Sequence, residues 1–126
     1  MTLRVLYVDD DADIREIVSL SLGLDPDMAV ETAASGQAAL ERARQGGLDL
    51  ILLDVMMPQM DGRTTFAALK DLGLTPAIPV IFVTARTQSH EIAQFKDLGA
   101  IGVIGKPFDP MTLARDVRAL QAAVAL

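Results

Sequence analysis

Short apolar stretches alternate with longer segments of helical periodicity along the chain, and this alternation restricts the fold more than any other feature. Five such pairs follow one another within 126 residues. The alternation is typical of a parallel sheet that is covered by helices on both faces. We therefore expect an α/β protein with five parallel strands, each followed by a helix.

The apolar runs and the helix-stop signals place each element along the chain. The expected strands are 3–8, 28–32, 50–53, 79–83 and 102–104. The expected helices are 12–24, a segment from the N-cap Ser35 to Gly46-Gly47, 62–72, 89–98, and a last helix that opens at Asp109-Pro110. The uninterrupted Leu and Ile run at 50–53 predicts a strand buried on both faces, in the middle of the sheet.

Helical spacing also predicts which apolar side chains face the sheet. The residues expected to be buried are Ile14, Ile17, Val18 and Leu22 in the first helix, Phe66 and Leu69 in the third, and Leu113, Val117, Leu120 and Val124 in the last.

Length and charge limit the classes of protein that the chain can represent. A chain of 126 residues is expected to form a single domain over residues 1–126. Its net charge of −6 disfavours direct contact with nucleic acid or anionic lipid. We found no apolar run of membrane-spanning length, no signal peptide and no cysteine. These features predict a cytoplasmic protein that binds neither nucleic acid nor membrane.

Polar side chains follow four of the expected strands, at their carboxyl ends. The first strand leads into Asp9-Asp10-Asp11, the third into Asp54, the fourth into Thr84, and the fifth into Lys106. In an open parallel sheet these ends form one edge, where ligands bind. Clustered carboxylates repel one another unless a cation neutralises them. Mg²⁺ fits an oxygen ligand set, and the lone histidine, His90, is expected on the solvated surface rather than at a metal.

Asp54 stands out among these acids because it follows the most apolar strand. A shielded carboxylate beside a cation can attack phosphorus and form an aspartyl phosphate. Lys106 and the Thr84 hydroxyl would then stabilise the phosphoryl oxygens. Capping of strand ends is the alternative explanation for a single acid, but it does not account for the whole set. The Lys106–Pro107 bond is expected to be an ordinary trans turn, although the cis form costs only about 0.5–1 kcal/mol.

Four segments together resemble the response regulator receiver domains of two-component signalling. They are residues 5–10 (VLYVDD), 53–62 (LDVMMPQMDG), 83–85 (VTA) and 106–108 (KPF), each in the expected order and after its expected strand. The resemblance covers nearly the entire chain. It implies a flavodoxin-like, doubly wound (βα)5 fold with strand order 2-1-3-4-5.

The resemblance also implies a role for each matching residue. Asp54 would accept the phosphoryl group, Asp9, Asp10, Asp54 and the Met56 carbonyl would hold Mg²⁺, Lys106 would contact the phosphoryl group, and Thr84 would be the switch hydroxyl. The donor would be a phosphohistidine on a sensor histidine kinase or a histidine phosphotransfer protein. Pro58 and Gly62 are expected to serve the turn itself.

The same resemblance implies the output. Phosphorylation would remodel the face made by the fourth helix, fifth strand and fifth helix, which would bind a downstream protein or an output domain absent from this sequence, or form a homodimer. The family usually carries an aromatic residue three positions before the lysine, where this chain has Val103. Ring relocation is therefore not expected here.

Two other functions remain open at this point. The first is a Mg²⁺-dependent phosphatase that turns over external substrates through a phosphoaspartate. Its usual second aspartate, two residues after the nucleophile, is replaced by Met56. The second is a phosphorylation-independent interaction domain, which Val103 favours and the retained acids and Lys106 oppose.

Overall fold

A computed structural model describes residues 2–125 of the chain, with side chains for residues 2–123. Five strands and five helices alternate along the chain. The strands are β1 (Leu3–Val8), β2 (Met28–Ala33), β3 (Leu50–Asp54), β4 (Val80–Thr84) and β5 (Gly102–Gly105). The helices are α1 (Ala12–Leu22), α2 (Gly36–Arg44), α3 (Gly62–Asp71), α4 (Ser89–Leu98) and α5 (Leu113–Ala125).

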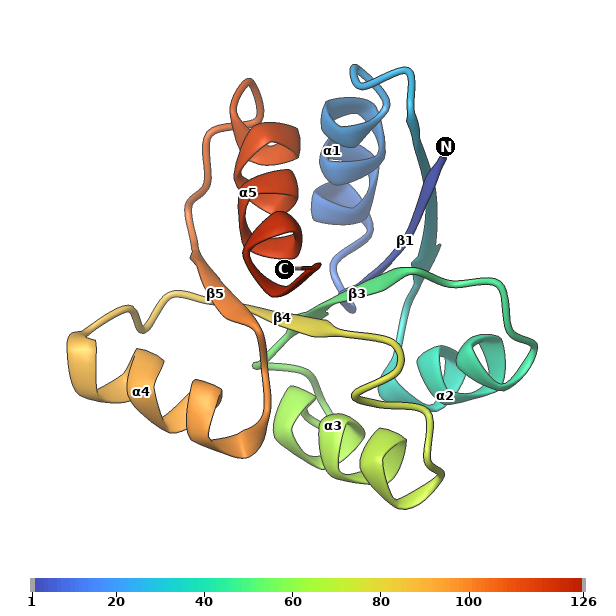
Figure 1. Cartoon of the computed structure of the whole chain (residues 1–126), viewed down its shortest axis with the longest axis vertical. Helices are drawn as coiled ribbons and strands as arrows, with labels where there is room; N and C mark the ends of the chain where they lie inside the picture. Colours follow the sequence, from blue (N-terminus) through green and yellow to red (C-terminus); the bar gives the residue numbers. More distant parts are fainter. Residues whose placement is uncertain (1, 126) are drawn as a thin grey trace.

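The strands form one parallel sheet in the order β2-β1-β3-β4-β5. Figure 1 shows α1 and α5 on one face of this sheet and α2, α3 and α4 on the other. The doubly wound α/β class and the strand order are as predicted. The central position of β3 is also confirmed.

Two apolar clusters fill the space between the sheet and its helices. One cluster contains Phe66, Phe82 and Phe95, and the other contains Tyr7, Val18 and Leu113. Residues 50–53 of β3 contribute alternately to both clusters and are fully buried. The predicted burial of Phe66 and Leu69 is confirmed.

Strand register brings the carboxyl ends of the central strands to the same edge of the sheet. Val8 pairs with Leu53, Asp54 with Val83, and Thr84 with Gly105. Residues that end or follow these strands therefore meet, as parallel pairing requires.

Side chains that accept backbone hydrogen bonds fix the starts of three helices. Asp11 accepts from the amides of Asp13 and Ile14 before α1. Ser35, as predicted, accepts from Ala38 before α2, and Asp61 caps α3. Such N-caps satisfy amide groups that have no partner within the helix.

The last helix starts later than predicted. Residues 109–112 form a turn in which the Asp109 carboxylate accepts from the Met111 amide, and the Asp109 carbonyl accepts from the Thr112 amide. Asp109 therefore caps a turn rather than the helix, and α5 begins at Leu113. The side chain of Val124, predicted on the buried stripe, lies outside the described residues.

Burial in α1 also differs from the prediction at one position. Ile17 is 41% exposed, whereas Val18 and Leu22 are buried and Ser21 is buried with them. The Ser21 hydroxyl donates to the Pro110 carbonyl, so the buried stripe of α1 turns toward the segment before α5. Ile17 lies at the edge of that contact.

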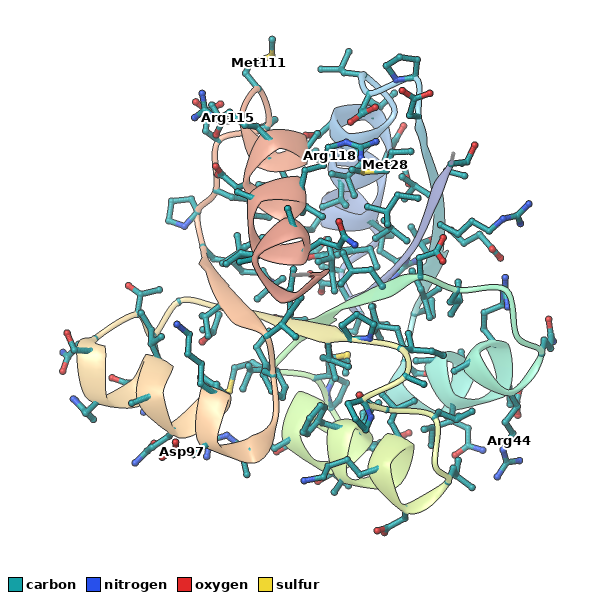
Figure 2. All side chains as sticks on the ribbon, viewed as in Figure 1. Met28, Arg44, Asp97, Met111, Arg115 and Arg118 are labelled. Carbon is teal, nitrogen blue, oxygen red and sulfur yellow. The ribbon has the colours of Figure 1, made fainter. Side chains whose placement is uncertain are left out.

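An ion pair joins the loop after α1 to the middle of α5. Figure 2 shows Arg118 between the two helices, where its guanidinium donates to the Asp25 carboxylate. Within the described part of the chain, no helix combines the length and apolar character that crossing a bilayer would require.

Candidate functional site

Asp9 lies directly after β1 and is held by several donors. It is only 1% exposed. The Tyr7 hydroxyl donates to its Oδ2 at 2.6 Å, and the Asp11 amide donates to its Oδ1 at 3.0 Å. The Asp9 carboxylate is therefore fixed before any ligand arrives.

Asp54 is the last residue of β3 and follows four fully buried residues. It is 4% exposed, and its Oδ1 accepts a hydrogen bond from Lys106 at 2.9 Å. No donor among residues 2–125 hydrogen-bonds to its second oxygen, Oδ2. Asp54 thus presents one paired oxygen and one oxygen available to a ligand.

Three of the predicted acids gather at this edge of the sheet. Asp9, Asp10 and Asp54 each offer a carboxylate oxygen, and these atoms lie within 4.8 Å of one another. Asp9 and Asp54 are buried, whereas Asp10 is exposed. The donor set is entirely oxygen and opens to solvent on one side, which suits a hard cation such as Mg²⁺ that retains some of its waters.

Lys106 reaches this cluster from the end of β5. Its Nζ lies 3.0 Å from Asp9 Oδ2 and 2.9 Å from Asp54 Oδ1. Its main-chain amide donates to the Thr84 carbonyl at 2.8 Å, which ties the lysine to the end of β4. The Lys106–Pro107 bond is cis, so the expected trans turn was wrong, and the cis form of an X–Pro bond is only slightly less stable than trans.

Burial and charge shift the ionisation of these groups in different directions. Burial raises the pKa of Asp54, and the hydrogen bond from Lys106 only partly opposes this. Burial also favours the neutral form of Asp9, but hydrogen bonds from Tyr7, the Asp11 amide and Lys106 outweigh it and lower the pKa. For Lys106, burial is outweighed by the two carboxylates, which raise its pKa. The ammonium thus remains charged beside the acids.

Thr84 and Met56 are the two remaining residues that the sequence predicts for the site. Thr84 ends β4, is buried, and its hydroxyl oxygen accepts from the Arg86 amide at 3.0 Å. Met56 lies two residues after Asp54, and its side chain is 76% exposed. The structure thus places Asp9, Asp10, Asp54 and Lys106 in one cluster, with Thr84 joined to it through Lys106. The chemical roles of these residues remain predictions.

Gly62 supports the site from behind. A Cβ atom at Gly62 would lie 2.4 Å from the Asp54 carbonyl oxygen and 2.8 Å from Val55 Cα. The Gly62 amide donates to the Val55 carbonyl at 2.9 Å. The start of α3 therefore packs directly on the backbone that carries Asp54, as expected for a residue that serves the turn.

Two residues near the site were not predicted from the sequence. Tyr7 contacts Asp9 because alternate residues of a strand point to the same face. Arg15 lies one turn into α1, and its guanidinium donates to the Asp9 carbonyl at 2.8 Å. The spacing of Tyr7 from Asp9 was a usable signal, whereas the Arg15 contact depends on how α1 packs.

The region around Val103 contains aromatic rings at other positions. Val103 pairs with Phe82 in the sheet and is partly buried against the cluster that includes Phe95. The Phe82 and Phe95 ring centroids are 4.7 Å apart. His90 is exposed on α4. Among the described residues, the one acidic side chain near its ring is that of Glu91, 3.8 Å away.

Comparison with known proteins agrees with this geometry. A family model described as "Response regulator receiver domain" matches residues 5–118. The chain belongs to the response regulator receiver domain family. One relative is the protein-glutamate methylesterase/protein-glutamine glutaminase of a Nocardioides species, which is 34% identical over 97% of this chain and 34% of its own length.

Individual relatives match over most of this chain. The transcriptional regulatory protein DltR of Streptococcus agalactiae is 34% identical over 92% of this chain and 50% of its own length. The response regulator PleD of Caulobacter vibrioides is 40% identical over 95% of this chain and 26% of its own length. The chain therefore spans about half the length, or less, of these curated relatives.

Solved structures show the same fold. The chemotaxis response regulator CheY4 of Vibrio cholerae has a TM-score of 0.85 and 35% identity, covering 95% of this chain and 99% of its own. A Francisella receiver domain has a TM-score of 0.86 at 24% identity, with 98% and 99% coverage, which supports the fold alone.

Proposed function

We propose that this receiver domain accepts a phosphoryl group on Asp54 in a Mg²⁺-dependent reaction and that phosphorylation switches the binding of a partner protein. The observation that carries the proposal is the bridge that Lys106 Nζ makes between Asp54 Oδ1 and Asp9 Oδ2, at 2.9 and 3.0 Å. A lysine so placed neutralises the acids before reaction and can contact the phosphoryl oxygens afterwards.

The chain's own residues divide the work of phosphoryl transfer. Asp9, Asp10, Asp54 and the Met56 carbonyl would hold Mg²⁺, which when bound neutralises charge on the transferring group. The free Oδ2 of Asp54 forms a bond to phosphorus while the bond from phosphorus to the donor nitrogen breaks. The electron pair leaves with the donor imidazole, which then takes a proton. Lys106 neutralises the new phosphoryl oxygens.

We propose that the donor is a sensor histidine kinase or a histidine phosphotransfer protein. An apolar surface on α1 and the turn before α5 supports contact with a protein. It consists of Ile17, Leu20, Leu24 and Met111, which are 41, 69, 64 and 77% exposed. A neighbouring groove shares Ile17 with this surface and is also lined by Ile14, Phe108 and Lys106. The Lys106 ammonium in turn contacts the buried acids. Figure 2 shows Met111 pointing away from the molecule.

The proposed output involves Thr84 and the elements beside it. Once phosphorylated, Asp54 would attract the Thr84 hydroxyl, which now accepts from the Arg86 amide. Movement at Thr84 would alter the face of α4, β5 and α5. A groove of about 550 Å³ on this face is lined by Val103, Thr112, Asp116 and Leu120. It would receive a downstream protein, an output domain, or a second copy of the chain.

The proposal includes three expectations from the sequence. Residues 1–126 form a single receiver domain, its location is cytoplasmic, and it turns over no external substrate. The exposed Met56, where a phosphatase would carry a second acid, favours self-limited chemistry at Asp54 over turnover. Hydrolysis of p-nitrophenyl phosphate at many equivalents per protein would contradict this part.

Phosphorylation itself is tested by incubating the protein with Mg²⁺ and acetyl phosphate. We expect mass spectrometry to find one added phosphoryl group, which is lost in Asp54→Asn and on chelation of the metal. Asp97→Asn, an exposed acid on α4, is the matched control and keeps the modification. A modification that survives Asp54→Asn would contradict the assignment.

A second function has one observation in its favour. Val103 lacks the ring that the family usually relocates, which suits an interaction domain independent of phosphorylation. A Mg²⁺ titration followed by NMR separates the two. Amide shifts at Asp10 and Asp54 that do not change with Mg²⁺ would favour this second function over the first.

A further inference from the structure

Tyr7 occupies an unusual position between the apolar core and the acid cluster. Its ring is 1% exposed and packs with Val18, Leu22 and Leu113 beneath α1 and α5. Its hydroxyl donates to Asp9 Oδ2 at 2.6 Å. This short distance is typical of a hydroxyl that donates to a charged carboxylate.

The hydroxyl is not needed for packing alone. A buried hydroxyl must keep a hydrogen-bond partner, because burial without one is strongly unfavourable. Phenylalanine would fill the same space without that requirement. Among residues 2–125, the carboxylate of Asp9 is the partner of the Tyr7 hydroxyl, so the hydroxyl serves the acid.

Three donors together define the orientation of Asp9. Tyr7 and Lys106 both donate to Oδ2, and the Asp11 amide donates to Oδ1. Lys106 is shared with Asp54 and would engage a phosphoryl group, whereas the Asp11 amide lies on an exposed turn. Tyr7 is therefore the buried and unshared donor.

We propose that Tyr7 is a positioning residue that holds the Asp9 carboxylate in the orientation required to bind Mg²⁺. This inference rests on the proposed function, because it assumes that Asp9 is a ligand. It predicts that loss of the hydroxyl weakens Mg²⁺ binding without impairing the transfer step. Partners that orient metal ligands typically change metal affinity by about 10–100-fold when removed.

Tyr7→Phe tests the inference directly. We expect calorimetry to find Mg²⁺ bound about tenfold more weakly than in the wild type. With acetyl phosphate, the Mg²⁺ concentration at half-maximal phosphorylation rate rises by the same factor, whereas the rate at saturating Mg²⁺ is unchanged. Thr75→Val is the matched control, since it removes a buried hydroxyl that donates to Ile78 O at 2.8 Å, away from the acids. It leaves Mg²⁺ affinity unchanged.

A second measurement keeps the native contacts and does not depend on how the variant folds. Tyr7 is the only tyrosine of the chain, so biosynthetic fluorotyrosine places one fluorine probe beside the site. We expect its NMR resonance to move with Mg²⁺ at the same midpoint as the Asp10 amide. A resonance that stays still while the Asp10 amide moves would overturn the inference.

The outcomes separate this inference from the proposed function. If the wild type binds Mg²⁺ and Tyr7→Phe binds it equally well, only the role of Tyr7 is wrong. If the wild type shows neither Mg²⁺-dependent shifts nor phosphorylation, the proposed function is wrong and the role of Tyr7 is overturned with it.

Discussion

Replacing Lys106 with methionine tests whether the site is built on charge compensation. The ammonium lies 2.9 Å from Asp54 and 3.0 Å from Asp9, and its side chain is 25% exposed. Lys106→Met keeps an unbranched chain of similar length but leaves the acids without their cation. The expected result is a less stable metal-free protein that Mg²⁺ restores.

The distances set the size of the effect. At an effective dielectric constant of about 20, each pair contributes roughly 6 kcal/mol of gross Coulomb attraction. Desolvation of the ammonium offsets most of this, and removing one partner of a buried pair typically costs about 3–5 kcal/mol. Because Lys106 remains in contact with solvent, we expect a loss of about 2–3 kcal/mol in the free energy of unfolding.

The loss should also depend on pH in a defined direction. Burial already raises the pKa of Asp54, and loss of the opposing hydrogen bond from Lys106 raises it further, so Asp54 binds a proton more tightly in the folded variant than in the unfolded chain. Its stability relative to the wild type therefore improves as pH falls from about pH 7 to about pH 4, near the ordinary Asp pKa of about 3.9. Saturating Mg²⁺ should reduce the deficit in the same way, because it supplies the missing positive charge.

Urea denaturation followed by circular dichroism measures these differences. Lys70→Met is the matched control, since the Lys70 amine donates to the Leu98 carbonyl on the surface rather than to an acid. It should change stability by less than about 0.5 kcal/mol. The reasoning is refuted if Lys106→Met matches this control, or if its deficit is the same with Mg²⁺ and at both pH values.

Two further predictions concern elements next to the site. Asp61→Ala removes the N-cap of α3 and should lower the free energy of unfolding by about 1 kcal/mol at neutral pH. The hydrogen bond from the Thr64 amide lowers the pKa of Asp61. The stabilisation that Asp61 gives the folded protein is therefore complete above the ordinary Asp pKa of about 3.9 and disappears as pH falls through the lower folded pKa. An acid titration in which Asp61→Ala loses the same stability at every pH would contradict this. Phe95→Ala removes the one buried side chain of α4 and should lower the free energy of unfolding in urea by about 3–5 kcal/mol. Leu98→Ala, at a more exposed position of the same helix, is the control and should lower it far less.

Much of the fold was predictable because strands and helices carry different periods. The run at 50–53 has no polar residue, so its central position in the sheet followed from composition. The alternation of elements also implied one sheet edge where Asp9, Asp54 and Lys106 meet. Strand order was not predictable from alternation, and it came from the resemblance of four segments to a family.

The errors occurred where tertiary contacts override local signals. Asp109-Pro110 has the composition of a helix start, yet the Asp109 carboxylate accepts a hydrogen bond from the Met111 amide within a turn that precedes the helix. Ile17 matches the helical spacing, but Ser21 is buried instead through its bond to the Pro110 carbonyl. The contact of Arg15 with the Asp9 carbonyl likewise depends on how α1 packs against the sheet. No local pattern contains such information.

The two sides of the site differ in how firmly they are built into the domain. Asp54 continues a strand buried from both faces. Thr84 instead leads to the exposed residues 85–88 and to α4, which has no side-chain N-cap bond and buries only Phe95. Local opening requires least free energy where little apolar surface is lost. Hydrogen exchange should therefore be fastest in α4 and slowest in β3, so the side of the site that carries Thr84 opens more readily than the side that carries Asp54.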